Sequence, residues 1–318
     1  MPNLQLAVQI LRLLDTPGIG VVKAQNILRR ARRAETSSSL EDRLLRQFLT
    51  ESQSEAFERN EERIRRLVES LEAKQVSLLP ISDPGYPAIL RARLLDKAPP
   101  LLFVIGNPAL LSAPGVGFCG SRHASEKGIA TAQDCSGQLA QEGLNVVSGF
   151  ASGVDLAAHR TALEVGGTTT VVLAEGILHF KVKQELRDVW DAERAVIVSE
   201  FLPGLPWSVH HAMQRNRTIC GLSLAMVLIE AGARGGSYEA GRAAIELGMP
   251  LFAAVYEGMP ESATGNAELL AQGARRLMKS RATHRANLSP ILAAIVDEKA
   301  RISGRAPEAK EAQLPVFS

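Results

Sequence analysis

The sequence predicts an α/β protein in which a small helical domain precedes a doubly wound, mostly parallel β-sheet. Two observations carry this prediction. Residues 1–75 show the apolar spacing of amphipathic helices, and from Leu101 onward short apolar runs alternate with helical patterns. Continuous β-branched runs separated by helices are typical of a parallel sheet that is covered on both faces.

The helical domain, residues 1–75, is expected to hold amphipathic helices at residues 4–14 (LQLAVQILRLL) and 55–74 (EAFERNEERIRRLVESLEAK). Between them, the turn TPGIG at residues 16–20 precedes an apolar-periodic segment that ends in basic residues. This arrangement is similar to a helix-hairpin-helix, in which the amides of a glycine turn meet a nucleic-acid phosphate. An ordinary turn between packed helices explains the same residues equally well.

Residues 76–100 are rich in proline and read as a connector that packs on its neighbour, because Leu, Ile and Tyr are interspersed. Residues 101–283 form the predicted Rossmann-like domain, and residues 284–318 a short helix and a tail. The strands of the domain are expected at seven apolar runs, namely LLFVIG, VGFCG, LNVVSG, TTVVLAEG, AVIVSE, LAMVLIEA and PLFAAVY.

Composition places the 318-residue chain among globular proteins that can bury a full core. The formal net charge of +2 decides nothing about nucleic acid, because binding depends on where basic residues cluster. Cys119, Cys135 and Cys220 are widely spaced without a CxxC pair, so we expect buried, reduced thiols. With neither a targeting segment nor an apolar stretch of membrane-spanning length in the sequence, a cytoplasmic location without membrane contact is expected.

Small residues follow several predicted strands, at the sheet edge where open α/β sheets bind ligands. Small residues and helix N-termini let backbone amides approach an anion, so these turns predict a phosphate-binding rim, although each turn alone would serve equally as a tight strand-to-helix connection. The chain has neither GxGxxG after its first strand nor GxxxxGK[ST], so we expect no dinucleotide and no other cofactor. The predicted rim consists of Gly120, Ser121, Ser148, Gly149, Phe150, Gly235, Gly236 and Ser237.

Cations near these turns extend the predicted anion site. Arg122 and Lys127 follow one strand, Arg215, Asn216 and Arg217 precede another, and Lys181 and Lys183 lie between two more. Guanidinium groups bind phosphates bidentately or stack on bases. The alternative, which is commoner for a pair of arginines, is that both are solvated on the protein surface.

Asp155 and His159 lie one helical turn apart after the second glycine-rich turn, where they share a helix face. We expect them to support the pocket, with Asp155 in the first helical turn and His159 partly buried; a polar pocket rim is the alternative. No other His or carboxylate near them has metal-ligand spacing, so we expect no metal.

Taken in order, these motifs resemble one family, the bacterial DprA/Smf proteins that process DNA. The resemblance is carried by DPGYPAILRARLLDKAPPLLFVIGN (83–107), GSR (120–122), SGFASGVDLAAH (148–159), GGTTTVVLAEGI (166–177), SEFLPG (199–204), RNRTICGLS (215–223), VLIEAGARGGS (227–237) and SATGNAELLAQGA (262–274). It implies a dimeric Rossmann-like domain that binds single-stranded DNA in a basic pocket and helps load a RecA-type recombinase, without catalysis. By motif match, Arg122, Arg215 and Arg217 would contact the DNA.

The chain departs from the family pattern at three places. Residues 178–190 lack the usual tyrosine-proline step, Glu239 and Ala240 stand in GGSYEAG where the family has SGSLxTA, and AVYEG replaces VPG. The usual C-terminal winged-helix-like domain is expected to be absent or reduced. These departures leave a second hypothesis open, a nucleotide sensor or a LOG-like nucleotide hydrolase using the same pocket.

Overall fold

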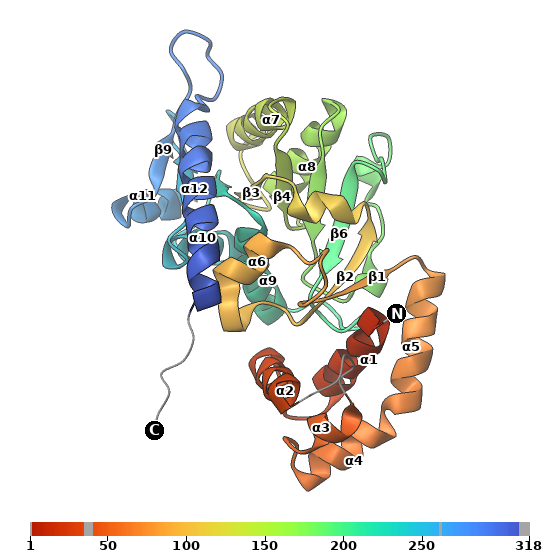
Figure 1. Cartoon of the computed structure of the whole chain (residues 1–318). Helices are drawn as coiled ribbons and strands as arrows, with labels where there is room; N and C mark the ends of the chain where they lie inside the picture. Colours follow the sequence, from red (N-terminus) through yellow and green to blue (C-terminus); the bar gives the residue numbers. More distant parts are fainter. Residues whose placement is uncertain (1, 35–40, 261–262, 312–318) are drawn as a thin grey trace.

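The computed structural model describes residues 2–34, 41–260 and 263–311. Over these residues the chain forms a group of helices followed by one nine-stranded sheet with helices on both faces (Figure 1). The strand order is β1-β2-β6-β5-β4-β3-β7-β8-β9. The predicted α/β fold with a mostly parallel sheet is therefore confirmed.

The seven apolar runs singled out in the sequence all form strands of this sheet. From β3 the chain first adds β4, β5 and β6 on one side and then β7, β8 and β9 on the other, as in a doubly wound fold. Every pair from β6 to β9 in this order is parallel, whereas β2 is antiparallel to β6. The bounds are β2 (Leu101–Gly106), β3 (Gly115–Cys119), β4 (Asn145–Ser148), β5 (Thr169–Val172), β6 (Ala195–Ser199), β7 (Ala225–Leu228) and β8 (Leu251–Ala254).

Regular structure also forms where none was predicted. The segment 76–100, read as a connector, contributes the edge strand β1 (Ser77–Pro80), antiparallel to β2, and the helix α6 (Ala88–Leu94). An edge strand tolerates a proline such as Pro80, because one side of the strand needs no ladder hydrogen bond. At the opposite edge, β9 (Arg275–Leu277) pairs with β8.

The two faces of the sheet are covered by different helices. On β3, Val116 and Phe118 pack toward α7 and α8, whereas Cys119 lies in the core shared with α6, α9 and α10. The helices and short 3-10 turns of this part are η1 (Leu95–Lys97), η2 (Pro108–Ser112), α7 (Glu126–Gln141), α8 (Val154–Glu164), η3 (Ile177–His179), η4 (Gln184–Leu186), α9 (Val209–Leu222), α10 (Gly236–Glu246) and α11 (Thr264–Ala271). All three cysteines are buried and free, as predicted.

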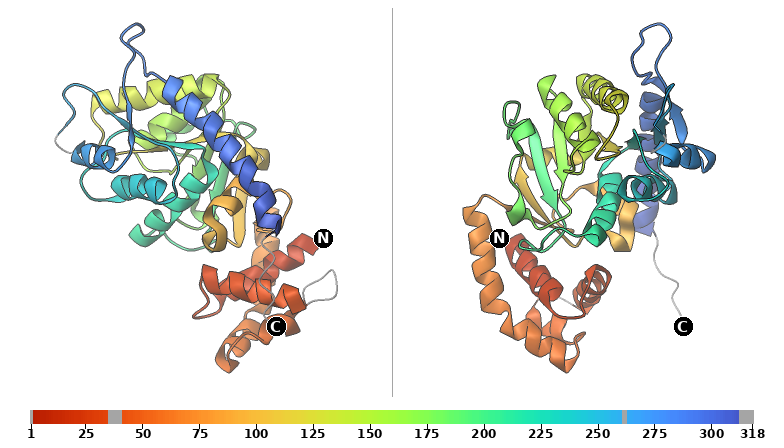
Figure 2. Two further views of the ribbon diagram at one scale, coloured as in Figure 1. Left: turned by 60° about the vertical axis from the view of Figure 1, so that its left-hand side comes forward. Right: turned by 180° about the vertical axis from the view of Figure 1, so that it is seen from behind.

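The N-terminal helices lie together at one end of the molecule in all three views (Figures 1 and 2). They do not have a core of their own, because a single buried cluster joins them to Phe103 of β2, Val171 of β5 and Ile197 of β6. These helices are α1 (Pro2–Asp15), α2 (Val21–Ala34), α3 (Asp42–Arg46), α4 (Glu51–Arg59) and α5 (Glu61–Ala73).

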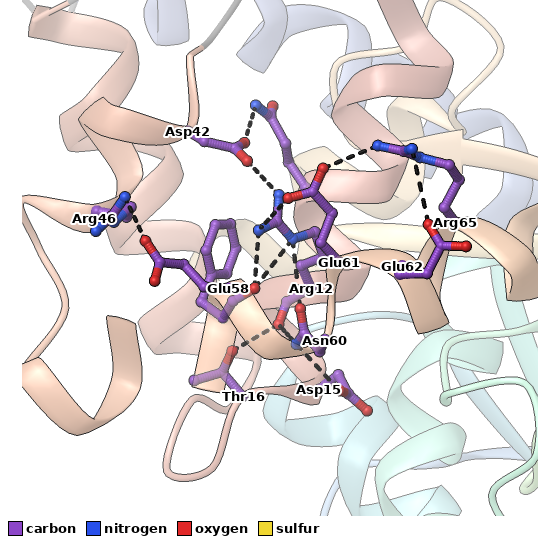
Figure 3. Close-up of polar contacts among 12 residues, drawn as sticks. Arg12, Asp15, Thr16, Asp42, Arg46, Glu58, Asn60, Glu61, Glu62 and Arg65 are labelled. Atoms are coloured by element: carbon purple, nitrogen blue, oxygen red, sulfur yellow. Dashed lines mark hydrogen bonds and ion pairs between the residues drawn. The ribbon is translucent and has the colours of Figure 1, made fainter. Parts of the chain in front are cut away.

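A buried arginine organises these helices (Figure 3). Arg12 is 3% exposed and donates from Nη2 to the Phe57 carbonyl at 2.8 Å, with its guanidinium carbon 3.9 Å from the centroid of the Phe57 ring. Asp42 and Glu61 supply the balancing negative charge. The TPGIG turn between α1 and α2 is held from α4, where Gln53 donates to the Pro17 carbonyl at 3.2 Å. Contact of this turn with DNA stays a prediction.

The C-terminal helix α12 (Ser289–Glu311) is 23 residues long, whereas the sequence predicted only a short helix. It extends because Ile291, Ala294 and Ile295 are buried in the same core as α7 and α8. A buried ion pair between Glu298 and Arg93 of α6, at 2.6 Å, fixes it further. The end of the predicted tail, residues 312–318, lies outside the described residues. Among the described helices, none has the length and apolar character that crossing a bilayer requires.

Candidate nucleic-acid interface

Two glycine-rich loops meet beyond the carboxyl ends of the neighbouring strands β3 and β7. One runs from Gly120 into α7, the other from Gly232 into α10, and Ser237 ties them together by donating from Oγ to the Gly120 carbonyl at 2.6 Å. Because the connection after β3 leads to β4 on one side and the connection after β7 leads to β8 on the other, a crevice opens between these strands. It holds a cavity of about 380 Å³ whose lining includes Gly120, Ser121, Arg122, Asp155, Arg215, Asn216, Arg234, Gly235, Gly236 and Ser237.

The turn after β4 closes this crevice on its other side. Gly153 has a φ of +76°, and a Cβ at this position would lie 2.4 Å from the Ser121 carbonyl oxygen. Only glycine therefore lets the two loops approach so closely. Beyond this turn lies a second cavity of about 320 Å³, which shares Arg122, Ala151, Trp207 and Arg215 with the first.

Arg215 is the most unusual residue of the crevice. It projects from α9, is 8% exposed, and its Nε has no hydrogen-bond partner. No carboxylate within the described residues lies at ion-pair distance from it, although Asp155 is near enough to favour its charge; burial nevertheless lowers the pKa of Arg215. A buried guanidinium without a partner is costly, and an anion in the crevice would lower that cost.

Gly149 makes the position of Arg215 possible. A Cβ on Gly149 would lie 1.8 Å from Nη1 of Arg215, so any larger residue would displace the guanidinium. The Gly149 carbonyl is in turn fixed by His159, whose Nε2 donates to it at 2.6 Å. Gly149 is therefore a packing surface for the arginine, rather than only a flexible link in a turn.

Asp155 lines the first cavity, whereas His159 lies behind the loop and is buried completely, not partly as expected. The Asp155 carboxylate accepts a hydrogen bond from the Ala151 amide at 3.2 Å. His159 is fully buried, its Nδ1 lies 2.6 Å from the Thr169 hydroxyl, and burial lowers its pKa. In the part of the chain that the structure describes, no cluster of His, Cys, Asp and Glu suits a metal ion.

Three residues that the sequence placed in the site lie elsewhere. Arg217 follows Arg215 by two positions on α9, so it points away from the crevice and pairs with Glu246 at 2.8 Å. Lys127 donates to the Glu257 carbonyl at 3.2 Å, outside both cavities. The Ser148 hydroxyl is buried and donates to the Phe118 carbonyl at 2.8 Å.

The remaining predicted residues have different positions within the site. Asn216 lines the first cavity and donates from Nδ2 to the Gly236 carbonyl at 3.0 Å, while Phe150 lines the second. Lys183, from the divergent segment 178–190, donates to the Phe150 carbonyl at 2.6 Å and lines the second cavity. Glu239 lies 3.6 Å from Arg242 on α10, and neither cavity is lined by it.

The family model of DNA recombination-mediator protein A matches residues 77–287, which include both loops and Arg215. The chain belongs to this family. Among curated relatives, the DNA processing protein DprA of Streptococcus pneumoniae is 36% identical over 200 residues, which are 61% of this chain and 68% of that protein. Protein Smf of Escherichia coli is 33% identical over 185 residues, 58% of this chain and 49% of that protein.

Solved structures of this DprA/Smf family agree with the fold. The X-ray structure of the S. pneumoniae DprA has a TM-score of 0.71 at 28% identity and covers 85% of this chain and 94% of that one. The structure of the Helicobacter pylori DprA, which is described for its single-stranded DNA binding mode, has a TM-score of 0.56 at 23% identity. The match covers 71% of this chain and 97% of that one.

Sequence reasoning missed two residues of the second cavity. Trp207 is 45% exposed, with its ring centroid 5.4 Å from the guanidinium carbon of Arg122. It lies in the segment FLPGLPWSV after β6, which lacks the run of glycines and serines found in the other loops, so only its place after a strand could have indicated it. Glu175 lies three residues after the end of β5, within the apolar run TTVVLAEG, and carries no motif signal of its own.

Proposed function

We propose that this DprA-family chain binds single-stranded DNA without sequence preference through the crevice beyond β3 and β7, and does not cleave it. The unpartnered, buried guanidinium of Arg215 is the observation that carries the proposal. A DNA phosphate would supply the charge that this arginine lacks, while the loop amides and the exposed Arg122 contribute further contacts. That the H. pylori DprA is described as binding single-stranded DNA supports the choice of ligand.

The matched pair Arg215→Ala and Arg217→Ala tests this directly, because both arginines come from α9 but only Arg215 faces the cavity. Fluorescence anisotropy with a labelled oligo-deoxythymidine should show affinity falling about tenfold or more for Arg215→Ala and less than about twofold for Arg217→Ala. Affinity should also fall steeply with salt, and Arg215→Ala should reduce that slope by about one unit. Equal effects of the two substitutions would contradict the proposal.

The biological role that we propose is mediation of DNA uptake, processing or recombination, with the chain acting as a homodimer that loads a RecA-type recombinase onto the bound strand. Family membership supports this role. Sedimentation of the free chain tests the dimer, and the rate of recombinase filament growth on protein-coated strands tests loading. A chain that binds DNA but leaves filament growth unchanged would retain only the binding function.

The alternative of a nucleotide hydrolase has less support in the geometry. Glu239, one of the departures that left this hypothesis open, lines neither cavity. Glu200 is buried, its carboxylate accepts hydrogen bonds from Thr218 and Gln214, and burial raises its pKa. Competition of mononucleotides against the labelled oligonucleotide, with chromatography for released base, distinguishes the two functions.

A further inference from the structure

The second cavity differs chemically from the first. The first is lined by three arginines and glycine-rich turns. The second shares two of these arginines, and adds a lysine, a second aromatic ring, aliphatic side chains and a carboxylate. Its own residues, beyond the four that it shares, are Phe150, Ser152, Leu173, Ala174, Glu175 and Lys183. Apart from Lys183, these residues are apolar, aromatic or hydrogen-bonding, which is typical of a pocket that holds a ring.

Glu175 is the residue that argues most strongly against a phosphate here. It is half-buried, and its side chain makes neither a hydrogen bond nor an ion pair with any residue that the structure describes. Lys183 is held by the Phe150 carbonyl at 2.6 Å, 4.6 Å from the centroid of the Phe150 ring, and burial lowers its pKa. The free carboxylate would repel a phosphate, but it is a good acceptor for N–H groups.

Trp207 adds a stacking surface at the boundary between the two cavities. Its indole is 45% exposed, and the guanidinium of Arg122 lies at its ring, 5.4 Å from the centroid. Arg122 and Trp207 line both cavities, so a ligand held at Arg215 in the first would have its next group beside the indole. Base stacking on an aromatic ring next to a basic groove is the usual way to hold single strands.

We propose that the second cavity is a nucleobase subsite, in which a base stacks on Trp207 and donates an exocyclic amino N–H to Glu175. This proposal rests on the proposed function, since the adjoining phosphate occupies the crevice at Arg215. At this one subsite it adds a preference for one base to phosphate contacts that are themselves independent of sequence. Cytosine carries a 4-amino donor where thymine carries an oxygen, which a carboxylate does not favour, so an oligo-deoxycytidine should bind more tightly than an oligo-deoxythymidine.

The test uses the intrinsic fluorescence of the protein. The chain has two tryptophans, and Trp190 packs on Phe180, outside both cavity linings, with ring centroids 5.8 Å apart. In the Trp190→Phe variant, a twelve-nucleotide oligo-deoxycytidine should quench the Trp207 emission. A dodecamer of abasic sites, which keeps the phosphates but has no bases, should bind without quenching. The control is that Trp190→Phe and the unmodified chain have the same anisotropy Kd.

Two substitutions complete the test in anisotropy titrations. Trp207→Ala should weaken oligo-deoxycytidine binding about fivefold or more and leave the abasic dodecamer unchanged, while Trp207→Phe should restore most of the affinity. Glu175→Gln should remove the preference for cytosine over thymine. Equal weakening of the two ligands by Trp207→Ala, or the absence of quenching by a bound oligonucleotide, would overturn the subsite. If no oligonucleotide bound at all, the proposed function itself would fail.

Discussion

Replacing Gly149 by alanine should disable the crevice without unfolding the chain. Gly149 has no positive φ, so an alanine backbone fits there, but its Cβ would lie 1.8 Å from Nη1 and 2.5 Å from Cζ of Arg215. The guanidinium must therefore leave its place. Losing one charged hydrogen-bonding contact to a phosphate costs roughly 1.5–3 kcal/mol, which is about a 10- to 150-fold loss of affinity for single-stranded DNA.

The assay is a double-mutant cycle by fluorescence anisotropy with Gly149→Ala, Arg215→Ala and both together. Because the methyl group acts only through the arginine, Gly149→Ala should cost almost nothing once Arg215 is alanine. Gly204→Ala is the matched control, since no atom lies within 4 Å of a Cβ at that glycine. Wild-type affinity in Gly149→Ala, or additive losses in the double variant, would refute the reasoning.

Three further predictions concern charge. Burial lowers the pKa of His159, so this histidine takes up a proton at a higher pH in the unfolded chain than in the folded chain. The free energy of unfolding should therefore fall as the pH drops below about 6.5, by up to about 1.4 kcal/mol per pH unit. Urea titrations at several pH values should show that His159→Gln removes this fall. Glu298→Ala removes the ion-pair partner of the buried Arg93 and should cost about 3–5 kcal/mol by urea unfolding. Glu246→Ala breaks only two exposed ion pairs, with Arg217 and Arg242, and should cost less than about 1 kcal/mol. Asp155→Asn keeps the acceptor for Ala151 but removes a negative charge beside the crevice, so anisotropy should show tighter DNA binding that converges with the wild-type value at high salt.

Much of the sheet could be predicted because its strands are nearly continuous apolar runs, which a parallel sheet buried on both faces requires. The edge strand β1 was not predicted, because Pro80 suggests a break in regular structure. The antiparallel pairing of β2 could not be predicted either, because it depends on contacts between distant segments that no local pattern shows. Loop positions were easier to predict than side-chain directions. Arg215 and Arg217 look equivalent in the sequence RNR. Because they lie two positions apart on the helix α9, their side chains point in different directions, Arg215 into the crevice and Arg217 toward Glu246.

Trp207 illustrates a different limit of the sequence. It comes after β6, whereas the arginine at its ring follows β3, and only the folded sheet brings them together. A single exposed tryptophan forms no recognisable pattern with its neighbours in the sequence, so the proposed base-stacking role of Trp207 could not be predicted from motifs. Glycine-rich turns, by contrast, reveal themselves because their residue types are demanded locally by the backbone.

The core that joins the N-terminal helices to β2, β5 and β6 sets the order of events during synthesis on the ribosome. The helices leave the exit tunnel first, but Ile197 follows about 120 residues after α5 has ended. At ordinary translation rates of about 5–20 residues per second, this delay lasts roughly 6–24 s. Throughout it only β1 and β2, which follow α5 closely, can cover the nascent helices, and the apolar side chains that pack on β5 and β6 stay open to a ribosome-bound chaperone.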